Sequence, residues 1–393
     1  MRRIYMDANA TTPLLPEVLE AMRPYWIAEF GNASSIHQRG QHARAAVDRA
    51  RESLARLLNC RAAEIVFTSG GTESDNLALF GLLSAGDRLI TTAIEHHAVL
   101  HAAQALAERG IEVTFLPCTP QGVIEADALR EALRLNPERQ RSTTVVSVML
   151  ANNETGVIQP VRELAEIAHA AGALFHTDAV QAAGKLPLDV KALGCDLLSL
   201  SGHKMYAPQG TGVLFVRRNV RLQSMFFGGL HERGRRPGTE NVPGIVGLGK
   251  AAELAQGWLA NGGAQRLAAL RDRLEQGILA AVDEAGVNGA GAERVANTCN
   301  LFFDNVEAEA LVIALDLKGL AVSGGSACQS GATEPSHVLT AMGLSEARAR
   351  GSIRLSLSRL TTEDEVDAAL GIVPGAVARL RELSPVKAGQ LTT

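Results

Sequence analysis

The chain has 393 residues, of which 46% are hydrophobic and 20% are charged, and this is enough for one large core and a smaller second domain. The formal net charge is −4 without a long run of like charge, so neither nucleic acid nor a membrane surface is expected as the main partner. No apolar stretch is long enough to cross a bilayer, and residues 1–12 lack the apolar segment of a signal peptide.

The five cysteines are scattered along the chain without a C-x-x-C pair. Neither a disulfide framework nor a zinc site is therefore expected. The composition predicts a cytoplasmic globular protein with reduced thiols.

Short apolar runs alternate with segments of helical periodicity through the first half of the chain. Strands are predicted at residues 65–68, 88–93, 112–116, 144–150, 173–176, 197–200 and 213–216. Helices are predicted at residues 43–58, 72–83, 99–108, 126–135 and 162–171. Strands and helices that alternate at this spacing predict an α/β fold, with a mostly parallel sheet covered by helices on both faces.

Polar motifs follow five of these strands. They are SGGTES at residues 69–74, IEHH at 94–97, ANNETG at 151–156, HTDAVQ at 176–181 and SGHK at 201–204. In such sheets ligands bind at the carboxyl ends of the strands, so one cleft is expected to collect all five motifs.

The first of these motifs predicts an anion site. Gly70 and Gly71 make the turn after the strand, and Thr72 opens the following helix. A helix N-terminus presents free backbone N–H groups and the positive end of the helix dipole. A phosphate group is the expected ligand, although the segment is neither a P-loop nor a G-x-G-x-x-G motif.

Lys204 lies in a Gly-bounded loop between two predicted strands. An isolated Lys is ordinarily a solvated surface charge, but a single amine at the end of a buried strand is what Schiff-base chemistry requires. Asp178 also follows a predicted strand, where a carboxylate is either a structural cap or a counter-ion for a bound cation. Their combination with the anion motif favours a functional site.

The pattern changes after residue 216, where a basic, Gly-rich loop covers residues 227–241. Beyond it, helices are predicted at residues 265–285, 308–317 and 363–380, and strands at 298–303 and 353–358. We interpret residues 13–241 as a large domain and residues 242–393, joined by residues 1–12, as a smaller α/β domain.

Cys328 lies in the loop SGGSACQSGATEPS at residues 323–336. A lone Cys is usually a small buried hydrophobe, but this loop of small, flexible residues is unsuited to core packing. The other four cysteines lie in or beside apolar stretches and are better structural candidates. His97 and His101 have the i, i+4 spacing of a helical metal pair, but no third ligand is evident.

The motifs SGGTES, HTDAVQ, SGHK and SGGSAC together resemble the cysteine desulfurases of the NifS/IscS kind. These belong to the class V aminotransferase family, whose members are pyridoxal 5′-phosphate (PLP) enzymes of fold type I. The resemblance spans nearly the whole chain and implies a large PLP-binding domain with a mostly parallel seven-stranded sheet. The departures are Ala207 and Gln209, where the family usually has Gly and Lys, and Gly71, where Ala is frequent.

The resemblance implies a role for each matched residue. Lys204 would hold PLP, Asp178 would contact its ring nitrogen, and Gln181 its phenolic oxygen. The other implied contacts are His96 stacked on the ring, Asn153 beside ring and substrate, Arg354 on the substrate carboxylate, and Gly71, Thr72, Ser201 and His203 at the phosphate. Thr239 would reach the phosphate of the neighbouring subunit, which implies a homodimer. For Arg354, the residues alone equally allow a surface ion pair.

The implied reaction converts L-cysteine to L-alanine and leaves a persulfide on Cys328, with His96 as the candidate for handling the thiol protons. The resemblance implies that the sulfur passes to an acceptor, an iron–sulfur scaffold protein, or to other thio-cofactors. As the one metal-related expectation, Cys328 would be shared transiently with a cluster on that scaffold.

Cys328 and Lys204 distinguish this interpretation from two alternatives. A selenocysteine lyase, or a kynureninase- or transaminase-like enzyme, does not need a thiol on such a loop. A non-catalytic scaffold with this fold would be expected to lose Lys204 or Cys328, and this chain has both.

Overall fold

The computed structural model describes residues 3–134, 142–324 and 334–383, and it contains the predicted seven-stranded sheet. The strands are β2 (Ile65–Thr68), β3 (Arg88–Thr92), β4 (Glu112–Leu116), β5 (Thr144–Ser147), β6 (Leu174–Asp178), β7 (Leu197–Ser201) and β8 (Gly212–Val216). Their order is β2-β8-β7-β6-β5-β3-β4. In this sheet β8 is the one strand that runs opposite to the other six, because it returns directly from the loop that follows β7. The prediction of a mostly parallel sheet is confirmed.

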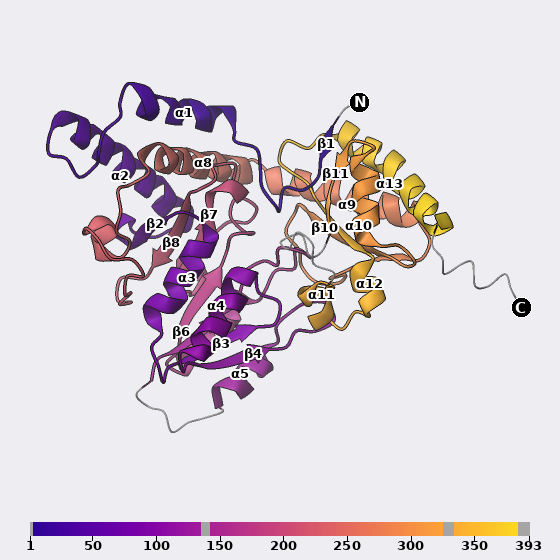
Figure 1. Ribbon diagram of the computed structural model, residues 1–393, viewed down its shortest axis with the longest axis horizontal. Coiled ribbons are helices and arrows are strands. Elements are labelled where there is room, and N and C mark those ends of the chain that lie inside the picture. Colours follow the sequence, from indigo (N-terminus) through magenta and orange to yellow (C-terminus); the bar gives the residue numbers. More distant parts are fainter. Residues whose placement is uncertain (1–2, 135–141, 325–333, 384–393) are drawn as a thin grey trace, which may run out of the picture.

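Helices cover both faces of this sheet, as predicted (Figure 1). They are α1 (Pro16–Ile27), α2 (Gln38–Leu58), α3 (Gly71–Leu82), α4 (His97–Glu108), α5 (Ala126–Arg134), α6 (Val161–Ala170), α7 (Val190–Leu193) and α8 (Val242–Ala260). Successive strand residues face opposite sides, so Leu89 and Val145 pack with α3 and α4 while Ile90 and Val146 belong to the core on the other face. These buried faces fix the register of the strands and hence the positions of the loops at their carboxyl ends.

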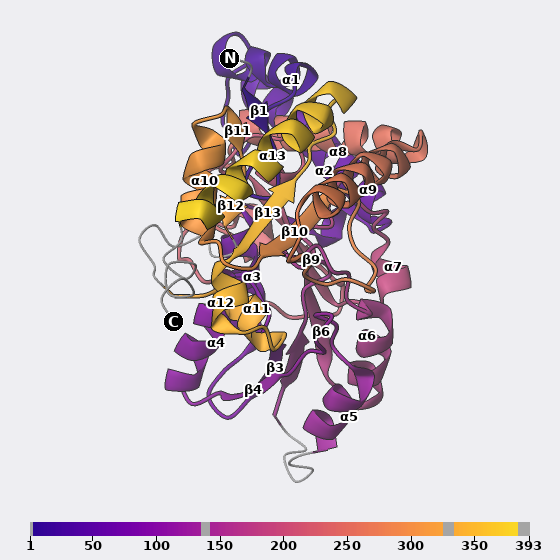
Figure 2. The ribbon, with the colours of Figure 1, turned by 90° about the vertical axis from the view of Figure 1, so that its right-hand side faces the viewer.

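A second, four-stranded sheet has the order β12-β13-β10-β9. Its strands are β9 (Ala285–Val287), β10 (Thr298–Phe303), β12 (Ser323–Gly324) and β13 (Ser352–Ser356). The accompanying helices are α9 (Gly263–Ala281), α10 (Ala308–Asp316), α11 (His337–Ala341), α12 (Glu346–Arg350) and α13 (Glu363–Leu383). Helices α9 and α13 pack against each other beside this sheet (Figure 2).

The N-terminal segment reaches across to the second sheet. Strand β1 (Ile4–Tyr5) pairs with β11 (Leu320–Ala321), and Met6 lies in the core with Leu301 and Leu355. The chain then crosses to the large sheet, where Thr12 donates its backbone N–H to the carbonyl of His203 at 2.9 Å. Residues 7–12 therefore lie between the two domains.

Helix α8 belongs with the large core, which bears on the expected domain boundary before residue 242. Its buried residues Ile245 and Leu248 lie in the core of the large sheet, and the helix packs along α1 and α2 (Figure 1). A Cβ on Gly249 would lie 2.6 Å from the Cα of Ala50, so this glycine allows the close approach of α8 to α2. We therefore propose that the boundary follows Ala260 rather than preceding Val242.

Within the described residues, no helix combines the length and the apolar character needed to span a membrane.

Candidate active site

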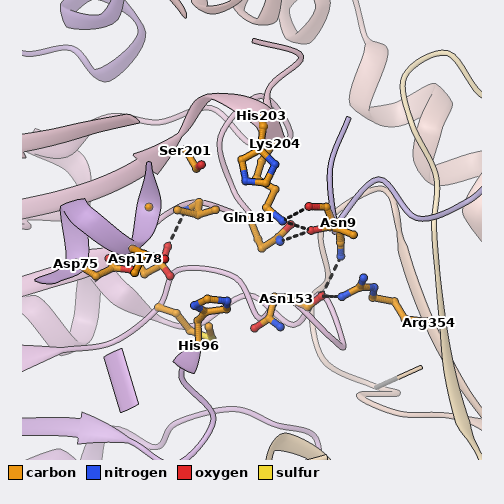
Figure 3. Close-up of a pocket in the computed structure, with 15 residues that line it drawn as sticks. Asn9, Asp75, His96, Asn153, Asp178, Gln181, Ser201, His203, Lys204 and Arg354 are labelled. Atoms are coloured by element: carbon orange, nitrogen blue, oxygen red, sulfur yellow. Dashed lines mark hydrogen bonds between the residues drawn. The ribbon is translucent and has the colours of Figure 1, made fainter. Parts of the chain in front are cut away.

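A cavity of about 370 Å³ lies at the carboxyl ends of the strands of the large sheet (Figure 3). Ten of the residues predicted for the site line it: Gly71, Thr72, His96, Asn153, Asp178, Gln181, Ser201, His203, Lys204 and Arg354. The first nine lie at, or shortly after, the carboxyl ends of β2, β3, β5, β6 and β7, as the shared edge of parallel strands requires. Arg354 comes from β13 of the second sheet, so both domains build the cavity.

Lys204 ends the short 3-10 turn Gly202–Lys204 that directly follows β7. Its Nζ donates to the carbonyl of Ala10 at 2.7 Å and to the carbonyl of Asn9. Gly202 is required at the start of this turn, because a Cβ there would lie 2.3 Å from Oγ1 of Thr211. The amine is therefore held in the cavity by the N-terminal segment that crosses between the domains.

Asp178 is the last residue of β6 and is buried. Its Oδ1 accepts the backbone N–H of Val180 at 2.8 Å, and burial raises its pKa to about 6 although this hydrogen bond and Lys204 oppose the rise. Asp75, on α3, is a second buried carboxyl group in the cavity wall, and burial and the charge of Asp178 raise its pKa. A carboxyl group in this position is suited to pair with a buried cationic ring nitrogen.

The predicted anion site lies at the N-terminus of α3, beside the cavity. Gly71 begins the helix, and a Cβ at this position would come within 2.8 Å of Cγ2 of Val180. Val180 therefore occupies the space that the methyl group of an Ala at position 71 would need. Ser201 and His203 line the same part of the wall, so hydroxyl and ring groups accompany the free backbone N–H groups of the helix.

His96 is the N-cap of α4, and its Nδ1 accepts the backbone N–H of Ala98 at 3.1 Å. Burial and the nearby Lys204 lower its pKa to about 4. The neutral ring therefore carries its proton on Nε2.

Arg354 is buried, which excludes the alternative of a surface ion pair. Its Nη1 donates to the carbonyl of Asn153 at 3.0 Å and its Nη2 to Oδ1 of Asp7 at 2.7 Å. Within the described part of the chain, Nε of Arg354 and Oδ1 of Asn153 are buried without a hydrogen-bond partner. Unsatisfied polar atoms in a cavity wall are groups that a ligand can satisfy.

Thr239 does not reach the cavity of its own chain. It lines a separate cavity of about 190 Å³ together with Ser69, Arg236 and Glu240. The role in a neighbouring subunit that was predicted for Thr239 remains a prediction. The departure at Gln209 is exposed and lies outside the cavity wall.

Cys328 lies outside the described residues, but the segments on both sides of its loop are placed at the site. Ser323 of β12 pairs with Arg354 of β13. On the other side, Ser336 donates its hydroxyl to Glu154 at 2.6 Å, and Nε2 of His337 contacts the carbonyl of Glu95 at 2.9 Å. The described residues before and after this loop therefore contact Arg354 and the sequence neighbours of His96 and Asn153.

The pair His97 and His101 gains a neighbour in the fold, since the rings of His97 and His337 lie 4.8 Å apart between centroids. Nevertheless, no group of three or more His, Cys, Asp or Glu side chains among the described residues is placed to hold a metal ion.

Asn9 and Lys185 are buried contributors that the sequence analysis missed. Asn9 lines the cavity, and its Oδ1 accepts a hydrogen bond from Nζ of Lys185 at 2.9 Å. The sequence offers one signal for Lys185: it lies four residues after Gln181, on a turn that follows a strand. No local pattern could pair it with Asn9, since 176 positions separate the two residues.

A model of the family described as aminotransferase class-V matches residues 4–369 of the chain. A protein named cysteine desulfurase IscS from Anaeromyxobacter sp. (strain Fw109-5) is 53% identical over 390 residues, which cover 98% of this chain and 94% of that protein. A solved structure titled NIFS-like protein has a TM-score of 0.88 and 36% identity, covering 96% of this chain and 100% of that one. Another, titled SspA in complex with cysteine, has a TM-score of 0.78 and 36% identity, covering 91% and 100%. These similarities extend over both domains.

Proposed function

We propose that this chain, which belongs to the aminotransferase class-V family, is a PLP-dependent cysteine desulfurase that converts L-cysteine to L-alanine and collects the sulfur as a persulfide on Cys328. Membership of the family confirms the resemblance drawn from the sequence motifs. Lys204, Asp178 and Arg354 meet at one cavity although they come from different strands and from both domains, and this convergence carries the proposal.

The residues of the cavity fit PLP. The N-terminus of α3, with Thr72, Ser201 and His203, would hold the phosphate, and Lys204 would bond the aldehyde. Asp178 would pair with the ring nitrogen and Gln181 with the phenolic oxygen, while the neutral ring of His96 would stack on the cofactor. When bound, PLP supplies an electron sink for the bonds of the substrate Cα.

The side chains of the cavity support the steps of the reaction. Arg354, with its unpaired Nε, would bind the carboxylate of L-cysteine. Nζ of Lys204 would take the proton from the substrate Cα and return a proton to the product carbon. The Cys328 thiolate would form an S–S bond to the substrate sulfur while the substrate C–S bond breaks, and the electrons of that bond remain on the carbon that becomes alanine.

A homodimer is part of this proposal. The loop of Thr239 is held in shape by a buried ion pair, in which Nη2 of Arg51 lies 2.6 Å from Oε1 of Glu232. Glu232 and Arg233 have φ angles of 48° and 59°, a strained backbone of the kind retained at functional positions. Close by in the sequence, Phe227 and Leu230 are 100% and 87% exposed, as expected of side chains that a second copy covers.

The persulfide requires an acceptor, and an iron–sulfur scaffold protein is the proposed one. During transfer, Cys328 would be shared transiently with a cluster on that scaffold. The cytoplasm is the proposed compartment, since Cys60, Cys118, Cys195 and Cys299 are free thiols.

Incubation of the purified, PLP-loaded protein with L-cysteine tests the proposed function. Alanine should form with a persulfide that peptide mass spectrometry locates on Cys328. Release of sulfide without a protein persulfide would favour a lyase, and activity restricted to selenocysteine would favour a selenocysteine lyase.

A further inference from the structure

Lys185 is a second lysine close to the cavity. It is buried, with 7% of its surface exposed. It lies four residues after Gln181 and directly after Gly184, whose φ of 71° turns the chain back toward the site. A Cβ on Gly184 would lie 2.9 Å from Cγ of Met205, so both the backbone angle and the available space favour glycine. The turn thus fixes the direction in which Lys185 enters the interior.

The Nζ of Lys185 donates to two amide oxygens, Oδ1 of Asn9 at 2.9 Å and Oε1 of Gln181 at 2.7 Å. Neither partner carries a charge that would offset the burial of an ammonium group. Burial, together with the charges of Lys204 and Arg354, lowers the pKa of Lys185 well below that of a free lysine. Burying an amine without a charged partner costs free energy of folding, so packing alone does not account for a lysine at this position.

These contacts determine which way two amides point. An amide has one acceptor end and one donor end, whereas the Lys amine offers N–H donors in both its charged and its neutral state. Because Oε1 of Gln181 is turned to Lys185, Nε2 is available as a donor, and it bonds the carbonyl of Asn9 at 3.0 Å. Nδ2 of Asn9 is turned in the same way toward the carbonyl of Asn153, at 3.1 Å.

The two oriented amides connect Lys185 to the residues of the proposed reaction. The carbonyl of Asn9 receives both Nε2 of Gln181 and Nζ of Lys204. The carbonyl of Asn153 receives both Nδ2 of Asn9 and Nη1 of Arg354. Figure 3 shows part of this series of hydrogen bonds, in which Asn9 lies between Lys204 and Asn153.

We propose that Lys185 is a positioning residue, which fixes the amide of Gln181 so that the N–H end, and not the carbonyl, faces the phenolic oxygen of PLP. Without the donor at residue 185, only the hydrogen bond from Nε2 to the carbonyl of Asn9 holds the orientation of the Gln181 amide, and a turned amide would place its oxygen where it repels the phenolate. This inference rests on the proposed function and adds to it a residue that does not itself contact the cofactor.

Lys185→Met tests the inference, because Met keeps the length and apolar stem of Lys and removes the N–H donors. The readout is the pH midpoint at which the visible absorbance of the PLP-loaded protein changes, measured without substrate. Loss of the Gln181 hydrogen bond disfavours the phenolate, so the midpoint should rise by about one pH unit, since a hydrogen bond to a charged acceptor corresponds to roughly a tenfold change in protonation. Lys185→Arg, which keeps donors, should shift it less.

The Lys185→Met substitution in a Gln181→Ala variant distinguishes an effect on the orientation of the Gln181 amide from a general disturbance of the site. If Lys185 acts through Gln181, adding Lys185→Met to Gln181→Ala should leave the midpoint where Gln181→Ala alone places it. A full additional shift in that background, or an unchanged midpoint in the PLP-loaded single variant, would overturn the inference. If Lys185→Met does not fold, Lys185→Leu, which likewise has no N–H donor, takes its place with the same expected shift. Failure of the wild-type protein to form alanine would instead contradict the proposed function.

Discussion

Arg354 and Asn153 join the two domains at the cavity, where Nη1 of the arginine donates to the main-chain carbonyl of the asparagine at 3.0 Å. Arg354 belongs to the smaller sheet, and Asn153 follows β5 of the larger one. Each also has a buried polar atom without a hydrogen-bond partner among the described residues, namely Nε of Arg354 and Oδ1 of Asn153. An amino-acid substrate, with a carboxylate and an amine, offers the groups that both atoms lack.

Replacing Arg354 should therefore weaken substrate binding. Arg354→Lys keeps the charge but loses the planar donor set, so kcat/KM for L-cysteine should fall by roughly 10- to 100-fold, mainly through KM. The matched control is Arg348→Lys, at another arginine paired with an aspartate, which lies on the surface and contacts Asp304 at 3.0 Å. Steady-state kinetics of both variants make the comparison, and equal losses would assign Arg354 a structural role.

Lys204→Ala should abolish turnover and covalent attachment of PLP, because Lys204 carries the amine of the cavity. Loss of the proton-transferring amine alone is expected to cost about 10³-fold in rate. Borohydride reduction of the loaded protein followed by peptide mass spectrometry should locate the cofactor on Lys204 in the wild type and nowhere in the variant. Lys250→Ala, on the outer part of α8, is the control and should retain both properties.

Asp178→Asn should keep the fold but lower the rate of alanine formation by roughly 100-fold or more, because the ring nitrogen would lack its counter-ion. A near-normal rate in the PLP-loaded variant would count against this role.

The same substitution should stabilise the protein without PLP at neutral pH. Burial raises the pKa of Asp178 to about 6, so the folded state binds the proton more tightly than the unfolded state, whose Asp pKa is near 3.8. The stability of the wild-type apoprotein thus falls as the pH rises from about 4 to 6 and stays lower above it. In thermal melting, Asp178→Asn should have a higher melting temperature than the wild type at pH 8 but not at pH 4. An increase of equal size at both pH values would contradict this assignment of the pKa.

Mixing a variant with weakened PLP binding and an inactive variant tests whether Thr239 serves the neighbouring subunit. Thr239→Ala should weaken PLP binding roughly tenfold, as expected for loss of one hydrogen bond to a charged phosphate. After subunits of Thr239→Ala and Lys204→Ala are unfolded and refolded together, hybrid dimers contain one site with both Lys204 and a neighbouring Thr239. Activity at limiting PLP should reappear in the mixture, and an active monomer by light scattering would remove the proposal.

Much of the fold could be predicted from periodicity. The predicted strands at residues 112–116 and 298–303 coincide with β4 and β10. The strand predicted at residues 144–150 ends earlier, at Ser147. Beyond it Val148 and Leu150 stay buried and donate their N–H groups to carbonyls of β6, whereas Met149 donates to Oε1 of Glu95. An apolar run marks burial, and it does not mark where regular pairing stops.

The residues near the cavity that no sequence motif predicted depend on contacts between distant parts of the chain. Asn9 and Lys185 are single polar residues whose partners are set by the crossing of the N-terminal segment between the domains. The domain boundary that we propose after Ala260 differs from the one predicted before Val242, because the role of Gly249 of α8 depends on its contact with Ala50 of α2, far away in the sequence. Residues that follow predicted strands could be placed, since the edge of a parallel sheet brings them together whatever their separation in sequence.

The reaction of the PLP-loaded Cys328→Ser variant with L-cysteine tests the desulfurase mechanism most directly. Only the thiolate form of Cys328 attacks the substrate sulfur, and a serine hydroxyl cannot replace it as a sulfur acceptor. The visible spectrum of the bound cofactor should still change when L-cysteine is added, because Lys204, Asp178 and Arg354 are intact, while no persulfide and almost no alanine should form. Alanine formation at the wild-type rate would contradict the mechanism and make direct release of sulfur by a lyase the better account.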